Sequence, residues 1–167
     1  IFKSSFEILG AKVALLLSQQ GCNVTITGRD SCKLNNVTSK LDLHLNQRHN
    51  KITVDYNDPT NMIKVVREHS SLNNINYDIL INNSGGPKPG SIIDSSVDDF
   101  YTTFNRHLIC NHLLFKEFYS HMKENKYGRV INIISTSVKQ PIRGLGVSNT
   151  ISGAVASWAK TLSYEVA

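Results

Sequence analysis

Short runs rich in β-branched residues alternate along this chain with segments of helical periodicity, and this alternation constrains the fold more than any other feature. The runs at 23–27, 51–54, 77–82 and 128–134 predict strands. The segments between them predict amphipathic helices. Repeated βα units of this kind build a parallel sheet that helices cover on both faces. We therefore expect a doubly wound, three-layer α/β domain of the Rossmann type, with residues 1–167 as one partial domain.

The ends of the elements carry their own signals. Ile1 and Phe2 suggest the end of a further strand, and a first helix is expected over 8–20, closed by Gly21. Two long helices are expected at 97–123 and 147–167. The inward-facing helix positions that the periodicity predicts are Val13, Leu16, Leu17, Leu34, Val37, Leu41, Met62, Val65, Val66, His69, Ile151, Val155, Trp158, Ala159 and Leu162.

Composition excludes several functional classes. With 167 residues and 40% hydrophobic content the chain can bury one core, and no apolar run approaches the roughly 20 residues that span a bilayer. The three cysteines form no CxxC pair, which argues against a disulfide framework or a zinc site and favours the cytoplasm. The net charge of +5 is scattered, so we expect neither nucleic-acid nor membrane partners.

Four short motifs follow or end the expected strands. They are GRD at 28–30, VD at 54–55, INNSG at 81–85 and GRVINIIS at 128–135. In this order they resemble the short-chain dehydrogenase/reductase family, and the likeness extends over essentially the whole chain. The stretch 141–162 is most similar to the oxoacyl-acyl-carrier-protein reductase branch. The resemblance implies reduction of a small carbonyl or oxoacyl substrate, and it suggests that the chain is truncated at both ends.

In this family the cofactor pyrophosphate lies at the N-terminus of the first helix, on a TGxxxGxG pattern. The corresponding positions here are Lys3, Ser4, Ile8 and Gly10, so one glycine of three is retained. Gly10 would preserve close packing of the helix on its neighbouring strand. At Ile8 a positive φ would strain a β-branched residue and reduce cofactor affinity.

The resemblance also locates the adenosine end of the cofactor. Gly28 occupies the position of the acidic residue that selects NAD, and Arg29 follows it, which favours NADP(H). Asp55 matches the aspartate at the edge of the adenine, and Asn83, Ser84 and Gly85 match the turn beside the ribose. Ordinary turn chemistry accounts for these residues equally well.

The catalytic positions depart from the family pattern. Ser135 matches the serine that polarises the carbonyl, but Ser148 and Ser152 stand where the proton-donating tyrosine and its lysine are expected. A serine hydroxyl is a far weaker acid than a tuned phenol. His107 replaces a helical asparagine, either as a proton relay or as a satisfied structural group.

Two readings follow from these positions. One is an NADP(H)-dependent reductase with degraded motifs, and the other is an inactive homologue that serves as a binding or structural subunit. In both, the helices at 97–123 and 147–167 are expected to form a homo-oligomer, and no metal is required. Lys160 and Tyr164 supply the missing residue types in reverse order, but they lie two turns beyond position 152 and are rejected as replacements.

Overall fold

The computed structural model describes the backbone of residues 3–166 and the side chains of residues 8–166. Strands and helices alternate in the predicted order. The expected strand end at Ile1 and Phe2 lies outside the described residues. The helices are α1 (Lys3–Gln19), α2 (Ser31–Thr38), α3 (Pro59–Asn73), α4 (Val97–Phe104), α5 (Cys110–Glu124) and α6 (Gly146–Val166), and the strands are β1 (Thr25–Gly28), β2 (Asn50–Thr53), β3 (Ile79–Asn82) and β4 (Arg129–Asn132).

The strands pair in parallel, as the alternation predicted. Thr25 of β1 lies opposite Asn50 of β2, and Ile79 of β3 lies opposite Arg129 of β4. Within the described residues these pairs form two separate two-stranded sheets. A space of about 100 Å³ between the sheets is lined by residues of β1 and β3 together with Tyr56 and Phe118.

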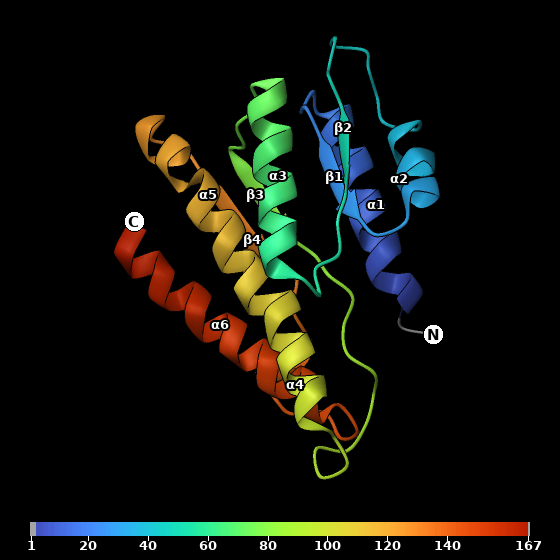
Figure 1. Ribbon diagram of the computed structural model, residues 1–167, viewed down its shortest axis with the longest axis vertical. Helices are drawn as coiled ribbons and strands as arrows, with labels where there is room; N and C mark the ends of the chain where they lie inside the picture. The colour runs from blue at the N-terminus through green and yellow to red at the C-terminus, as the bar shows by residue number, and fades with distance from the viewer. Residues whose placement is uncertain (1–2, 167) are drawn as a thin grey trace.

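Helices lie on both faces of the strands, which gives the three expected layers. Figure 1 shows α3 and α5 in front of β3 and β4, and α1 behind β1 and β2. The largest core cluster joins α3, α5 and the strands around Met62, which is 0% exposed. A second cluster packs Val147, Ile151 and Val155 of α6 against α4. The fold is thus a Rossmann-type α/β arrangement.

Local signals in the sequence fix several helix ends. Asp58 caps α3, where its side chain accepts a hydrogen bond from the backbone N–H of Asn61, and Pro59 occupies the first turn. Gly21 follows α1 with a φ of 85°, and the backbone N–H of Cys22 donates to the carbonyl of Leu17. This is the Schellman arrangement that a glycine at the helix end predicts.

The structure corrects the prediction for the first helix. Helix α1 begins at Lys3 instead of residue 8, and Leu16, expected to face inward, is 61% exposed. Ala14 and Ser18 are buried instead. A Cβ on Gly10 would lie 2.7 Å from Asn83 Nδ2, so this helix face must be small to approach the strand end. Leu16 lies two residues from Ala14 and therefore projects from the opposite side of the helix.

The helix expected over 97–123 is continuous but irregular. A π-helical turn, Asn105–Ile109, joins α4 to α5, and the backbone N–H of Cys110 donates to the carbonyl of Asn105. Single π-turns inside helices occur frequently at functional sites. Among the described residues, no helix combines the length and apolar character that crossing a membrane requires.

Burial distinguishes Cys110 from the more accessible cysteines Cys22 and Cys32. Cys110 is 0% exposed, its Sγ lies 3.3 Å from the carbonyl oxygen of Tyr56, and burial raises its pKa to about 12. At pH 8 only about one in ten thousand such thiols is ionised. We expect iodoacetamide to modify the exposed Cys32 in the native protein and Cys110 only after unfolding, as measured by peptide mass spectrometry. Equal native labelling of both cysteines would contradict this assignment.

Candidate functional site

The carboxyl ends of the strands and the loops that follow them carry half of the predicted site residues. Parallel strands end at a common edge, where open α/β folds bind their ligands. Arg29 follows β1, Asp55 follows β2, and Ser135 follows β4. The loop after β3 contributes three more, Asn83, Ser84 and Gly85.

Two of the three predicted catalytic serines are in contact. The backbone N–H of Ser135 donates to Ser152 Oγ over 3.4 Å, which joins the end of β4 to α6. Ser135 Oγ accepts a hydrogen bond of 3.1 Å from the backbone N–H of Ser137 and so caps a short 3₁₀ turn. Ser148 lies one turn before Ser152 on α6, and residues four apart share a helix face. Both α6 serines therefore belong to the helix face next to Ser135.

Sequence reasoning missed a buried amide network beneath these residues. Asn132 Oδ1 accepts from Asn82 Nδ2 at 2.8 Å and from Asn111 Nδ2 at 3.3 Å. Asn82 and Asn111 are buried, and buried amides require such partners. The network connects the ends of β3 and β4 with α5. Its signal in the sequence was an asparagine at the end of each of two strands that are rich in apolar residues, Asn82 in β3 and Asn132 in β4.

His107 lies in the π-turn and contacts the loop after β3. Its Nε2 lies 3.1 Å from the carbonyl oxygen of Gly85, and its Nδ1 lies 3.0 Å from Ser84 Oγ. A carbonyl only accepts, so in the neutral ring Nε2 carries the proton and Nδ1 accepts from the serine hydroxyl. Burial, with a smaller effect from Arg106, lowers the pKa of His107, although the bond to Gly85 opposes this shift. A neutral His107 thus holds the loop in place.

At the adenosine end of the predicted cofactor site, two arginine side chains lie near the turn that follows β2. Asp55 Oδ1 accepts a hydrogen bond of 2.9 Å from the backbone N–H of Asn57, so its side chain stabilises the turn after β2. Arg29 is exposed at the end of β1. Arg106, which the sequence did not single out, reaches the same region from the π-turn. Two guanidinium groups beside one carboxylate fit a phosphorylated adenosine.

The predicted pyrophosphate positions lie on α1. Ile8 is within the helix, is 57% exposed, and is absent from the described residues with positive φ, so the strain expected there does not occur. Regular helix occupies the predicted pyrophosphate positions, because α1 covers Lys3–Gln19. Ser4 belongs to the first turn of α1, and its side chain lies outside the described residues. Gly10 permits the close approach to Asn83 noted above.

The loop after β3 is held against the beginning of α6. The backbone N–H of Gly90 donates to the carbonyl of Gly144 over 2.7 Å, and that of Gly146 donates to the carbonyl of Gly90 over 3.1 Å. A Cβ on Gly146 would lie 2.6 Å from the Ile92 Cα, so only glycine allows this contact. These bonds bring the loop close to the helix that carries Ser148 and Ser152.

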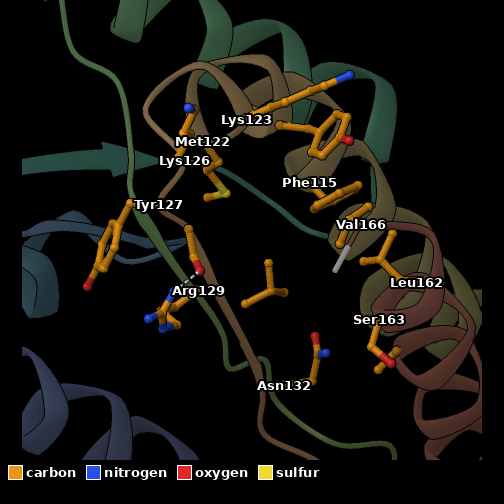
Figure 2. A pocket seen from close by; sticks show the side chains of 14 residues that line it. Phe115, Met122, Lys123, Lys126, Tyr127, Arg129, Asn132, Leu162, Ser163 and Val166 are labelled. Carbon is orange, nitrogen blue, oxygen red and sulfur yellow. Dashed lines mark hydrogen bonds between the residues drawn. The ribbon is translucent and has the colours of Figure 1, made fainter.

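A larger pocket lies away from the predicted site residues. Figure 2 shows this cavity of about 460 Å³ between the end of α5, strand β4 and the end of α6. None of the predicted catalytic or cofactor residues lines it. Lys160 and Tyr164, farther along α6, pair with each other, with the lysine nitrogen 4.4 Å from the ring centre. The described residues contain no group of histidine, cysteine and carboxylate side chains suited to a metal ion.

The lowered pKa of His107 predicts a pH dependence of stability. A histidine with a folded pKa below its usual 6.5 binds fewer protons in the folded state than in the unfolded state. Its contribution to stability is therefore complete above pH 6.5 and is lost as the pH falls through the folded pKa. We expect the free energy of unfolding, measured by urea denaturation, to fall between pH 7 and 5 more in the wild type than in His107→Gln. Parallel pH profiles would contradict the assignment.

Comparisons with known proteins agree with this geometry. A family pattern described as short chain dehydrogenase matches residues 6–167. The NADPH-dependent reductase BacG of Bacillus subtilis (strain 168) is 26% identical over 163 residues, which cover 95% of this chain and 61% of that protein. Two solved structures are also similar. One is YwfH, described as an NADPH dependent reductase involved in bacilysin biosynthesis, with a TM-score of 0.85, 23% identity and coverage of 94% of this chain and 62% of that one.

The other is L-sorbose reductase from Gluconobacter frateurii, solved with NADPH and L-sorbose. It has a TM-score of 0.84 and 21% identity, and the match covers 93% of this chain and 60% of that one. At these identities the structural likeness establishes the fold. The chain spans about three fifths of the length of all three proteins. With the match over residues 6–167 and the arrangement of strands described above, the chain belongs to the short-chain dehydrogenase family.

Proposed function

We propose that this chain forms the dinucleotide-binding part of an NADP(H)-dependent reductase that acts on carbonyl or oxoacyl substrates. The observation that carries the proposal is the contact between Ser135 and Ser152, which joins the end of β4 to α6. The contact supports the proposal, because Ser152 lies on the same helix face as Ser148 and its partner Ser135 is the residue that would polarise a carbonyl. The homo-oligomer predicted through the helices at 97–123 and 147–167 is part of the same proposal.

The charge at the adenosine end supports NADP(H) over NAD(H). Arg29 follows β1, where an acidic residue would accept hydrogen bonds from an unmodified ribose. Arg106 adds a second guanidinium at this edge of the fold. Arginine binds phosphate through several parallel N–H donors. When bound, the nicotinamide supplies the hydride for carbonyl reduction.

Ser135 is suited to bind a substrate carbonyl. Its oxygen already accepts a hydrogen bond from the backbone of Ser137, which fixes the direction of the side chain. The hydroxyl hydrogen is then free to donate toward a carbonyl oxygen. Such a hydrogen bond would stabilise the negative charge that develops on the oxygen during hydride transfer.

Proton donation is the weak step in this proposal. Ser148 holds the position of the acid, and Ser152 supplies no ammonium group to tune it. Loss of a general acid costs roughly 10²- to 10⁴-fold in rate. We therefore expect a slow reductase in which Ser148 or water delivers the proton. The alternative is a binding or structural subunit without catalysis, favoured by the same two serines.

Direct binding separates these functions. We expect NADPH titrated into the purified protein to give saturable nicotinamide fluorescence, with NADH binding more weakly because it lacks the phosphate that the arginines recognise. Ser135→Ala should then lower the reduction rate of ketones and acetoacetyl thioesters without weakening NADPH binding. No saturable binding at about millimolar NADPH would sink the reductase function. An unchanged rate in Ser135→Ala would remove that serine from the reaction.

Restoring the missing acid is a second test. The double variant Ser148→Tyr, Ser152→Lys places a phenol and an ammonium group one helical turn apart beside Ser135. We expect its kcat to exceed that of the wild type by about 100-fold or more, since a positioned general acid contributes at least that much. The matched control is Ser148→Phe, Ser152→Lys, which fills the same volume without the hydroxyl. Equal kcat values for the two double variants, both with NADPH bound, would refute the proposed geometry.

A further inference from the structure

Arg106 joins two loops that follow strands of different sheets. Its Nε and Nη2 donate to Asn57 Oδ1 over 3.1 and 2.6 Å, and its Nη1 donates to the carbonyl oxygen of Gly85 over 3.0 Å. Asn57 follows β2, whereas Gly85 follows β3, and β2 and β3 belong to separate sheets. One guanidinium therefore fixes the spacing of the two loops.

The π-turn supplies this side chain at the required place. Arg106 and its neighbour His107 both belong to the π-turn Asn105–Ile109, and both bind the carbonyl oxygen of Gly85. The shared acceptor means that two successive side chains of the turn reach one loop. The irregular segment thus directs a charged group and an imidazole to the carboxyl ends of the strands. Of the two, Arg106 also reaches Asn57 in the region assigned above to the adenosine end, whereas His107 contacts only the loop after β3.

The charge of Arg106 is only partly matched by its surroundings. Its hydrogen-bond acceptors are a neutral amide and a neutral carbonyl. Burial and the nearby positive charge of Arg29 lower the pKa of Arg106, and the charge of Asp55 opposes them. Two guanidinium groups near one carboxylate leave an excess of positive charge. A ligand that carries a phosphate would relieve the repulsion between Arg29 and Arg106.

We propose that Arg106 is a specificity-determining residue for the phosphorylated adenosine half of the dinucleotide. It holds the loops of Asn57 and Gly85 at a fixed spacing and presents its planar guanidinium to the purine, while Arg29 binds the ribose phosphate. Guanidinium groups stack on aromatic rings and bind phosphate, so a single ligand uses both arginines. This inference rests on the proposed dinucleotide binding, and it adds a residue that the sequence motifs do not contain.

The probe for this role is 2′,5′-ADP, which carries the adenosine and its ribose phosphate without the nicotinamide. We expect isothermal titration calorimetry to show at least a tenfold loss of affinity in Arg106→Gln, because the variant loses both the charge and the bridge between loops. Arg106→Lys keeps the charge but cannot reproduce the planar fork, so its affinity should also fall. Arg48→Gln removes one exposed cation from the segment between α2 and β2, and it should bind within about twofold of the wild type.

A substitution of Asn57, which accepts hydrogen bonds from Arg106, tests the effect of charge without removing the link between the two loops. Asn57→Asp keeps an oxygen that can accept hydrogen bonds from Arg106 and adds a negative charge. It should therefore lower the affinity for 2′,5′-ADP more than the affinity for unphosphorylated adenosine. Thermal melting of each variant separates loss of fold from loss of binding. If Arg106→Gln does not fold, Asn57→Asp decides the outcome, and equal effects on the two ligands overturn the proposal.

The two proposals fail in different ways. Wild-type protein that binds neither NADPH nor 2′,5′-ADP would overturn dinucleotide binding and, with it, the role of Arg106. Wild-type protein that binds both ligands, together with a folded Arg106→Gln that binds 2′,5′-ADP within twofold of the wild type, would overturn only the role of Arg106.

Discussion

Parallel pairing of the strands is the constraint on which the rest of this structure depends. Because β1 runs parallel to β2 and β3 runs parallel to β4, the loops after the two strands of each pair emerge at the same end, and Arg106 links the loop after β2 to the loop after β3. Residues far apart in the chain, such as Arg29 and Ser135, are brought to that edge without any need for long loops. Within the described residues no backbone ladder joins the two sheets, so side chains such as Arg106 and core packing connect them.

Much of this arrangement was predictable from local patterns. The β-branched runs located all four strands, and Asp58 with Pro59 and Gly21 marked helix ends correctly. The prediction failed at α1, where helical periodicity alone cannot distinguish an apolar face from a small-residue face. Leu16 is more hydrophobic than Ala14, yet the close approach of Gly10 to Asn83 makes the small residues the buried ones. Tertiary packing determines which face of α1 is buried, and the periodicity of the sequence does not contain this information.

The site was predictable only where motifs resemble the family pattern. Such motifs singled out Ser135, Asp55 and Gly85 as candidates. Arg106 has no local signal, and Asn132 has only that of a polar residue at the end of a strand. Asn132 matters because it satisfies amides from β3 and α5 at once, and Arg106 matters because a π-turn directs it across two loops. Both roles depend on contacts between residues at least 21 positions apart. A pattern confined to neighbouring residues cannot reveal them.

The positions of Ser148 and Ser152 on α6 explain how side chains proposed to lie at the active site can differ while the fold persists. Val147, Ile151 and Val155 bury one face of α6, with exposures of 4%, 4% and 1%. The two serines follow Val147 and Ile151 directly, so they are rotated by about 100° from the buried face. Substitution at 148 and 152 therefore changes the chemistry beside Ser135 without removing a core side chain. Under the proposed function, α6 keeps the backbone position of a general acid and carries a serine there.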